Sequence, residues 1–213
     1  MNPIIKPADI EKRSFEIITE ELGGRAFPEG QAEVVKRVIH TSADFDYADN
    51  LVFSPDVVAK AKDALRKGAT IVTDTNMALA GISKATLAKL GGKAVCFMAE
   101  EQVAKEAKER GVTRAAVSME HAAKLEGPVI FAIGNAPTAL IRLHEMIEAG
   151  EINPALIIGV SVGFVNVVES KELFLGGRTP YIIARGRKGG SNVAAAICNA
   201  LLYQLYTREG FEK

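Results

Sequence analysis

Short apolar runs rich in β-branched residues alternate along this chain with longer segments whose apolar residues recur every three or four positions. The runs are residues 69–73, 94–98, 128–133, 155–160 and 181–184. Such alternation is typical of βαβ units, in which helices cover both faces of a mostly parallel sheet. The 213 residues contain no internal repeat and no Pro/Ser-rich linker. We therefore predict one α/β domain over residues 1–213.

The helical segments show apolar stripes at 30–39 and 136–149. Glycines at 68 and 150 are placed to end two of the helices. The last predicted helix, 191–206, is apolar almost all round, which implies burial in the domain or at a subunit contact. From this we expect a homodimer.

The charge balance and the cysteines exclude several classes of protein. The 26 Lys and Arg match 26 Asp and Glu, so the excess positive charge of a nucleic-acid or membrane-surface binder is absent. Cys96 and Cys198 lie far apart without a metal-binding or disulfide pattern, which favours a reducing compartment. The first residues lack the pattern of a signal peptide, and the run 155–168 is too short to span a bilayer. We expect a cytoplasmic protein whose partner is a small molecule or another protein.

Polar residues follow three of the predicted strands, where a doubly wound sheet binds its ligands. The junctions are residues 73–77, 134–138 and 186–192. Each begins a helix, whose free N–H groups favour an anion. The alternative is that Asp74 or Thr75, Asn135 and Ser191 merely cap their helices. Three such junctions on one edge predict a pocket for a ligand with several carboxylates.

The glycine-rich segment 185–192 matches neither G-x-G-x-x-G nor G-x-x-x-x-G-K-[ST], which disfavours a nucleotide site. Arg185 and Lys188 in this segment are candidates to pair with ligand acids. There is no G-x-S-x-G elbow, and Cys96 lies in a predicted apolar strand, so a serine or cysteine nucleophile is disfavoured. Metal-ligand spacing is also absent, so we expect no metal site.

His40 is the strongest candidate among the three histidines. His121 and His144 lie inside amphipathic segments beside charged neighbours, where a structural or solvated role is expected. His40 is predicted to end the helix 30–39 and to open a polar stretch with Asp44 and Asp46. A helix C-terminus and nearby carboxylates both favour imidazolium, so we expect a proton donor. The alternative is a helix-ending histidine without a function.

Six ordered blocks resemble the precorrin-8X methylmutase family over residues 8–205, nearly the whole chain. They are I-E-K-R-S-F near the N-terminus, K-R-V-I-H-T-S-A-D-F around His40, T-D-T-N-M at 73–77, G-N-A-P-T-A-L at 134–140, G-V-S-V-G-F-V at 159–165 and R-G-R-K-G-G-S-N-V-A-A-A at 185–196. The resemblance implies a homodimer of Rossmann-like α/β domains that binds a corrinoid tetrapyrrole near the subunit interface without an added cofactor. It also implies an isomerase of cobalamin biosynthesis that moves a methyl group from C-11 to C-12 of the ring.

The family's catalytic histidine falls on His40, its arginine after a G-x-T pattern on Arg114, and a hydroxyl residue on Ser83. The junctions and the resemblance together define the candidate substrate-binding residues. These are Arg13, Ser14, Thr41, Ser42, Thr75, Asn76, Ser83, Arg114, Asn135, Thr138, Arg185, Lys188 and Ser191. The segment HTSADFDYA at 40–48 resembles the branch of the family that inserts cobalt early, which implies the cobalt-carrying substrate rather than the metal-free one.

Two other functions remain open from the residues. A non-catalytic corrinoid carrier could use the same acid-binding edge without proton chemistry. An unrelated enzyme acting on a small carboxylate could use Asp44 or Asp74 as a base, and the same two carboxylates could converge as in a glycosidase.

Overall fold

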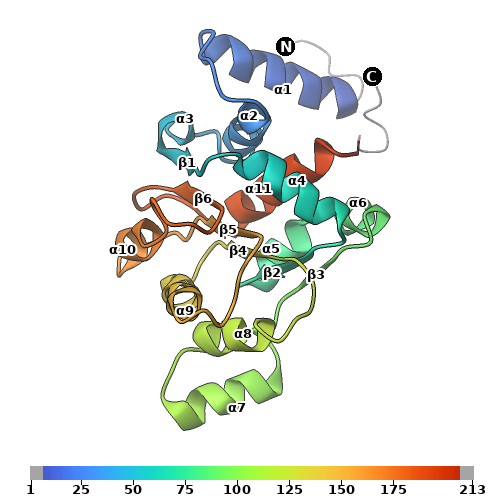
Figure 1. Ribbon diagram of the computed structural model, residues 1–213. Helices are drawn as coiled ribbons and strands as arrows, with labels where there is room; N and C mark the ends of the chain where they lie inside the picture. Colours follow the sequence, from blue (N-terminus) through green and yellow to red (C-terminus); the bar gives the residue numbers. More distant parts are fainter. Residues whose placement is uncertain (1–6, 207–213) are drawn as a thin grey trace.

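The computed structural model describes residues 7–206, which form a six-stranded sheet with helices on both sides (Figure 1). The strand order is β1-β6-β5-β4-β2-β3. All neighbours pair in parallel except β1, which runs antiparallel to β6 at one edge. The strands are β1 (Leu51–Phe53), β2 (Thr70–Thr73), β3 (Lys93–Val95), β4 (Val129–Ile133), β5 (Leu156–Gly159) and β6 (Tyr181–Ala184). The predicted α/β fold with a mostly parallel sheet is confirmed.

Four of the predicted strands agree with the structure to within a residue at either end. The strand predicted at 94–98 extends too far, because β3 stops at Val95. Phe97 instead packs against helices. Cys96 therefore lies outside the strand and is half-buried. Strand β1 was not predicted, because three residues at a sheet edge are too few to show a period.

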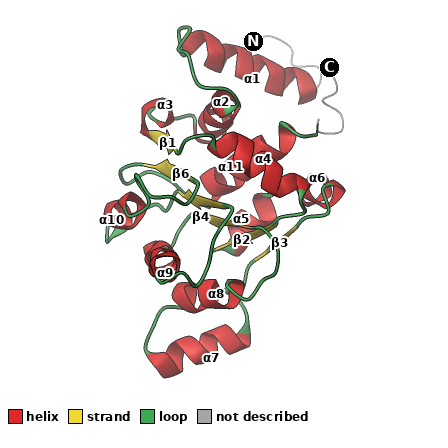
Figure 2. Cartoon of the chain, viewed as in Figure 1, coloured by secondary structure: helices red, strands yellow, loops and turns green. Residues whose placement is uncertain are grey.

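Eleven helices lie within the described residues (Figure 2). They are α1 (Pro7–Glu21), α2 (Gln31–Ser42), α3 (Tyr47–Asn50), α4 (Val57–Arg66), α5 (Asn76–Gly81), α6 (Lys84–Lys89), α7 (Glu101–Arg110), α8 (Arg114–Ala122), α9 (Pro137–Glu148), α10 (Val167–Glu172) and α11 (Ser191–Tyr203). The glycines at 68 and 150 follow α4 and α9 with positive φ, as predicted. No helix among residues 7–206 is both long and apolar enough to cross a membrane.

The sheet separates two apolar cores. Along β4, Ile130 and Ala132 face a core built with α2, α4 and α11, whereas Phe131 and Ile133 face a core built with α8 and α9. Because successive side chains of a strand point to opposite faces, a strand buried on both faces is apolar throughout. The helix 191–206 ends earlier than predicted, at Tyr203, and its burial lies largely within this fold.

Helices α2 and α11 pack against each other and run in opposite directions. The Gln204 side chain, just after α11, donates to the Gly30 carbonyl just before α2, at 2.9 Å. The C-terminal end of α2 therefore lies toward the start of α11, on the side where the parallel strands end. Helix α1 packs across α2 and buries Ile18 there (Figure 1).

Helix α2 extends beyond the predicted 30–39 and ends at Ser42, so His40 lies in its last turn instead of after it. Ala43 ends the helix with φ 53°, and its N–H donates to the Ile39 carbonyl. A left-handed alanine costs roughly 1–2 kcal/mol and leaves no glycine signal in the sequence. The Ser42 hydroxyl supports the turn by donating to the Val38 carbonyl at 2.8 Å.

Candidate active site

The strand order reverses between β2 and β4, because the chain passes from β2 to β3 on one side and continues through β4, β5 and β6 on the other. Such a reversal opens a crevice at the carboxyl ends of the strands, which is where ligands bind in this class of fold. Two of the predicted polar junctions, 73–77 and 134–138, flank this position. The candidate site is built around it.

Asp74, at the end of β2, fills this crevice. Its carboxylate accepts N–H groups from Gly134 at 2.9 Å, Asn135 at 2.8 Å and Ala136 at 2.6 Å, at the start of α9. Burial raises the pKa of this fully buried carboxyl, and the three N–H bonds oppose the rise. The N–H groups of residues 134–136 are thus already bonded to a carboxyl group of the protein itself, so they are not free for a ligand as expected.

Thr75 and Ser191 bring the junctions after β2 and β6 together. Their hydroxyl oxygens are 2.8 Å apart, and Thr75 also caps α5 by accepting the Ala78 N–H at 3.0 Å. Gly134 permits the approach, because a Cβ there would lie 2.7 Å from the Ser191 Cα. Asn76 and Asn135 are exposed beside this contact. Thr75, Ser191 and Asn135 therefore share one edge, as the sequence predicted.

The α11 N-terminus has no side-chain cap, since Gly190 occupies the N-cap position. The alternative that Ser191 merely caps its helix is therefore wrong: Ser191 is the first residue of the helix and bonds to Thr75 instead. No side chain among the described residues accepts a hydrogen bond from the first N–H groups of α11, so these groups remain available to a ligand.

Lys188 links the β6–α11 loop to the turn after α2. Its ammonium lies 2.7 Å from Asp44 and 2.6 Å from Asp46. The hydrogen bond from Lys188 lowers the pKa of the Asp44 carboxyl, and the two carboxylates raise the pKa of Lys188. Lys188 therefore serves first to hold the segment that follows His40 at the sheet edge. Asp44 is correspondingly a poor candidate for a free base.

His40 is exposed, and its ring stacks on Phe15 of α1 with centroids 5.2 Å apart and planes 15° apart. The Arg37 guanidinium also lies over Phe15, at 4.7 Å, and pairs with Glu11 at 2.6 Å. The imidazole is thus held against an aromatic ring while its edge remains open to solvent. Thr41 is exposed beside it.

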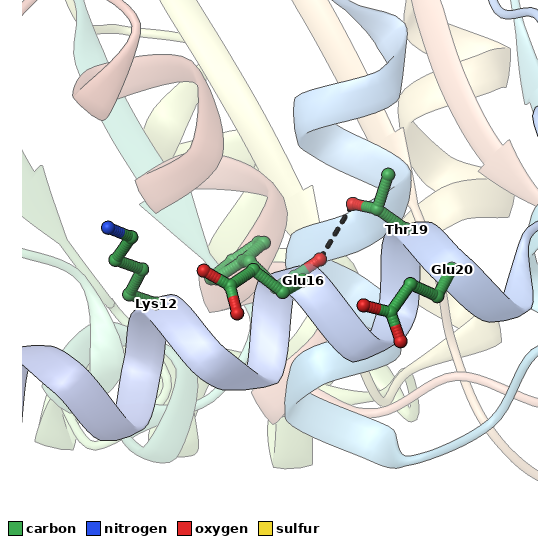
Figure 3. A pocket seen from close by; sticks show the side chains of 5 residues that line it. Lys12, Glu16, Thr19 and Glu20 are labelled. Atoms are coloured by element: carbon green, nitrogen blue, oxygen red, sulfur yellow. Dashed lines mark hydrogen bonds between the residues drawn. The ribbon is translucent and has the colours of Figure 1, made fainter.

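Arg13 and Ser14 lie on α1, and their polar atoms bond within that helix. Arg13 pairs with Glu16 at 3.0 Å, and the Ser14 hydroxyl donates to the Ile10 carbonyl at 2.8 Å. A shallow hollow of about 440 Å³ lies beside them on α1 (Figure 3). It is lined by Lys12, Phe15, Glu16, Thr19 and Glu20. Neither contacts His40, because Phe15, on which the His40 ring stacks, lies on a different face of α1.

Arg114 and Thr138 lie at the starts of α8 and α9, which are joined by Thr113. Thr113 caps α8 by accepting the Ala116 N–H, and its hydroxyl donates to Thr138 at 2.9 Å. Arg114, the first residue of α8, is exposed. Both candidates therefore lie where α8 joins the α9 N-terminus.

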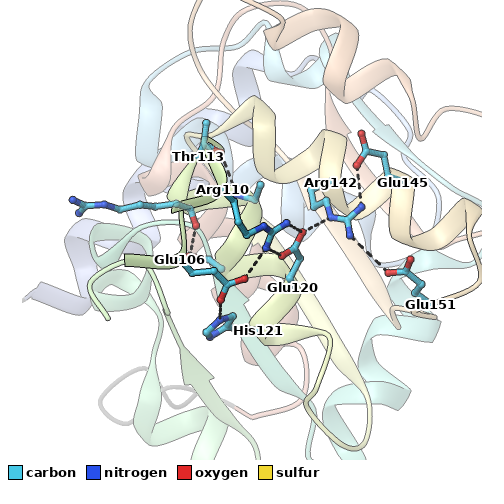
Figure 4. A network of polar contacts seen from close by, with 11 residues as sticks. Glu106, Arg110, Thr113, Glu120, His121, Arg142, Glu145 and Glu151 are labelled. Atoms are coloured by element: carbon cyan, nitrogen blue, oxygen red, sulfur yellow. Dashed lines mark hydrogen bonds and ion pairs between the residues drawn. The ribbon is translucent and has the colours of Figure 1, made fainter. Parts of the chain in front are cut away.

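A network of charged residues links α7 and α8 to α9 (Figure 4). Glu120 accepts from both Arg110 and Arg142, and Glu106 pairs with Arg110 at 2.6 Å. His121 bonds to Glu106 at 2.9 Å, which gives this histidine the structural role expected of it.

Two further candidates are Ser83, which lies off the sheet edge, and Arg185, which forms an ion pair. The Ser83 N–H donates to Asn199 at 2.8 Å, and its hydroxyl lies 2.9 Å from Thr86. Asn199 is eight residues along α11 from Ser191, about 12 Å down the helix, so Ser83 lies below the edge. Arg185 pairs with Glu172 at 3.2 Å.

Sequence reasoning missed a group of exposed apolar residues at the same edge. Phe164 and Val165 follow β5 and are 80% and 79% exposed, and Met77 follows β2 at 73%. The sequence did contain a signal for these residues. The apolar segment G-F-V at 163–165 lies beyond the end of the strand predicted at 155–160. Within residues 7–206 no cluster of His, Cys, Asp or Glu could hold a metal ion.

The fold and the edge define the class: a doubly wound α/β protein with a candidate ligand site, both polar and apolar, at the carboxyl ends of its strands. A model of the precorrin-8X methylmutase family matches residues 9–204. The cobalt-precorrin-8 methylmutase of Salmonella typhimurium is 45% identical over 96% of this chain and 99% of its own. The precorrin-8X methylmutase of Pseudomonas aeruginosa is 43% identical over 90% of this chain and 93% of its own. The crystal structure of precorrin-8x methyl mutase from Thermus thermophilus superposes with a TM-score of 0.83 at 36% identity, covering 91% of this chain and 95% of that one.

This chain belongs to the precorrin-8X methylmutase family. It is a methylmutase, an isomerase of cobalamin biosynthesis.

Proposed function

We propose that the enzyme moves a methyl group from C-11 to C-12 of cobalt-precorrin-8, or of metal-free precorrin-8X, to give cobyrinic or hydrogenobyrinic acid. His40 is the proton donor. The observation that carries this role is the exposed His40 ring, fixed flat against Phe15 at 5.2 Å in the last turn of α2. A donor held in one orientation, with its edge open, is what acid catalysis on a bound ring requires.

In this proposal, protonated His40 donates to the conjugated ring near its C-11/C-12 edge. The donation withdraws electron density, and the methyl group migrates over one face of the ring. A positioned acid contributes roughly 10² to 10⁴ in rate, or about 3 to 5 kcal/mol. Tighter binding of the product-like ring supplies the remainder, so product release is expected to be slow.

The substrate is an apolar macrocycle with acidic side chains, and the edge offers groups of both kinds. The uncapped α11 N-terminus at Ser191 suits one carboxylate, with Thr75 and Asn76 beside it. Exposed Arg114, with Thr138 and Asn135 near the start of α9, suits another. The ion pairs of Arg13, Arg185 and Lys188 are exposed enough to exchange a carboxylate of the protein for one of the substrate. Thr41, Ser42 and Ser83 complete the proposed contacts.

We further propose a homodimer in the cytoplasm, with the substrate near the subunit contact. The exposed apolar residues of the sheet edge are consistent with a surface that is covered in use. The two free thiols fit a reducing compartment. We propose the cobalt form as the natural substrate, in which the metal belongs to the macrocycle.

The test is conversion of each C-11-methylated intermediate, followed by NMR of where the methyl group sits. We expect the product to carry it at C-12, with faster turnover of the cobalt form. A corrinoid that binds but keeps the absorption spectrum of the substrate would indicate a carrier and contradict the proposal.

A further inference from the structure

Lys171, in α10, is a fully buried lysine without a carboxylate partner among the described residues. Its ammonium donates to two backbone carbonyls, those of Ser161 at 3.0 Å and Lys188 at 3.2 Å. The first carbonyl belongs to the loop after β5 (160–166), and the second to the loop after β6 (185–190). One side chain therefore holds two loops that are consecutive along the sheet edge.

The two loops also touch through their backbones. The Gly190 N–H donates to the Val160 carbonyl at 2.8 Å, and the Gly163 N–H donates to the Arg187 carbonyl at 3.2 Å. A Cβ on Gly189 would lie 2.0 Å from the Val160 oxygen, so only glycine allows this approach. The Ser161 hydroxyl is buried without a hydrogen-bond partner in the described chain. On the β5 side, Lys171 is thus the side chain that anchors Ser161.

Above Lys171 the joined loops present a surface that is apolar at its centre and basic at its rim. Phe164 and Val165 are almost fully exposed, and the Arg187 guanidinium lies 5.4 Å from the Phe164 ring centroid. The neighbouring side chains Arg185 and Lys188 are also cationic. A flat apolar ring with carboxylates at its periphery is complementary to an exposed aromatic side chain with cationic side chains beside it.

Stability alone does not explain a lysine at position 171. Burying an ammonium without a counter-charge costs free energy, and an apolar residue of similar volume would avoid that cost. Burial indeed lowers the pKa of Lys171 to about 8. A residue that costs stability and fixes two exposed loops is expected to serve the geometry of those loops.

We propose that Lys171 is a positioning residue that locks the loops after β5 and β6 into one wall of the corrinoid site, with Phe164 and Val165 against the ring and Arg187 toward its acid groups. The proposal rests on the proposed function, because it takes the corrinoid as the occupant of this edge.

The chain contains no tryptophan, so Phe164→Trp introduces a single tryptophan at the wall, which can be excited at wavelengths where the four tyrosines do not absorb. Its emission anisotropy reports how firmly the loop is held, and its quenching by an added corrinoid product reports binding. The activity and Kd of this variant are measured first and serve as the reference for all others. Lys171→Met then removes the ammonium while keeping the aliphatic stem.

We expect Lys171→Met to lower the anisotropy of this fluorophore and to raise the corrinoid Kd and KM about tenfold, with a much smaller change in kcat. Lys60→Met is the matched control, because Lys60 donates to a loop carbonyl, that of Pro55 at 3.1 Å, next to the opposite end of β6. It should leave anisotropy, Kd and KM unchanged. A merely structural role would lower the melting temperature without changing Kd in the folded protein.

If Lys171→Met does not fold, Lys171→Gln is used in its place. Its amide keeps a hydrogen-bond donor but has a shorter reach, so the corrinoid Kd should lie between that of the reference protein and the tenfold higher value expected for Lys171→Met. Unchanged anisotropy and Kd in the folded Lys171 variants would overturn the proposal. Dissociation of a dimer by Phe164→Ala, with corrinoid binding intact, would also overturn it and make the wall a subunit contact. Corrinoid binding at the wall without methyl migration in the wild type would instead refute the proposed function and leave this inference standing.

Discussion

The imidazole of His40 lies nearly parallel to the ring of Phe15, with centroids 5.2 Å apart. The two residues belong to different helices, α2 and α1, so the orientation of His40 depends on how α1 docks. Arg37 strengthens that docking, because it lies over Phe15 and pairs with Glu11. The N-terminal helix is thus part of the proposed catalytic geometry, although it contributes only a small part of the core.

Replacing Phe15 with Leu should lower kcat about tenfold and leave the corrinoid Kd nearly unchanged, since the donor loses its orientation while the binding edge stays intact. Phe27→Leu is the control, because Phe27 also lies under an arginine, Arg25 at 5.3 Å, and has no ring contact with His40. Steady-state kinetics and absorbance titration measure the two constants. Equal kcat values for both variants would show that the stacking has no role.

Replacing Asp74 with Ala should destabilise the fold by about 3 kcal/mol, because three N–H groups, two of them in buried hydrogen bonds, lose their acceptor. Added formate should restore part of the melting temperature by occupying the vacated anion site, and chloride at equal ionic strength should restore less. Thr113→Ala, which removes an ordinary helix cap worth about 1 kcal/mol, should not respond to formate. A formate effect of equal size in both variants would contradict the assignment.

The contact between Thr75 and Ser191 should show coupling in a double-mutant cycle. With Thr75→Val and Ser191→Ala we expect about 1 kcal/mol of interaction free energy from urea unfolding, the net value of one hydrogen bond. Purely additive effects would mean that the two junctions are not joined in solution.

The stability of the wild type relative to Lys171→Met should rise with pH. The pKa of Lys171 is about 8 in the folded protein, against 10.5 for an unperturbed lysine. Between these values the unfolded chain binds more protons than the native one, so the free energy of unfolding increases as pH rises. The difference between the two proteins should grow by up to about 3 kcal/mol from pH 7 to pH 10.5. A flat or falling difference in urea unfolding would contradict a buried ammonium.

The fold was predictable where burial on both faces makes a strand apolar throughout, as in residues 128–133. Strand β1 was not, because its three residues depend on pairing with β6 and carry no pattern of their own. The end of α2 was missed for a related reason: Ala43 takes a left-handed conformation that its sequence does not signal.

The location of the candidate site at the edge of the sheet was predictable, but the contacts between its residues were not. Polar residues that favour helix starts marked the junctions at 75, 135 and 191, although only Thr75 caps a helix. Nothing local in the sequence showed that Asp74 reaches the N–H groups sixty residues away. Lys171 lies in the segment E-S-K-E, which is typical of a solvated helix. Its burial arises only when the loops after β5 and β6 close over it.

The most direct test of the account is turnover by His40→Ala, with His144→Ala as the control histidine on α9, whose ring packs on Phe174. We predict that His40→Ala binds the corrinoid with nearly wild-type Kd but loses roughly 10² to 10⁴ in kcat, while His144→Ala retains activity. Methyl migration to C-12 at the wild-type rate in His40→Ala would contradict the central claim.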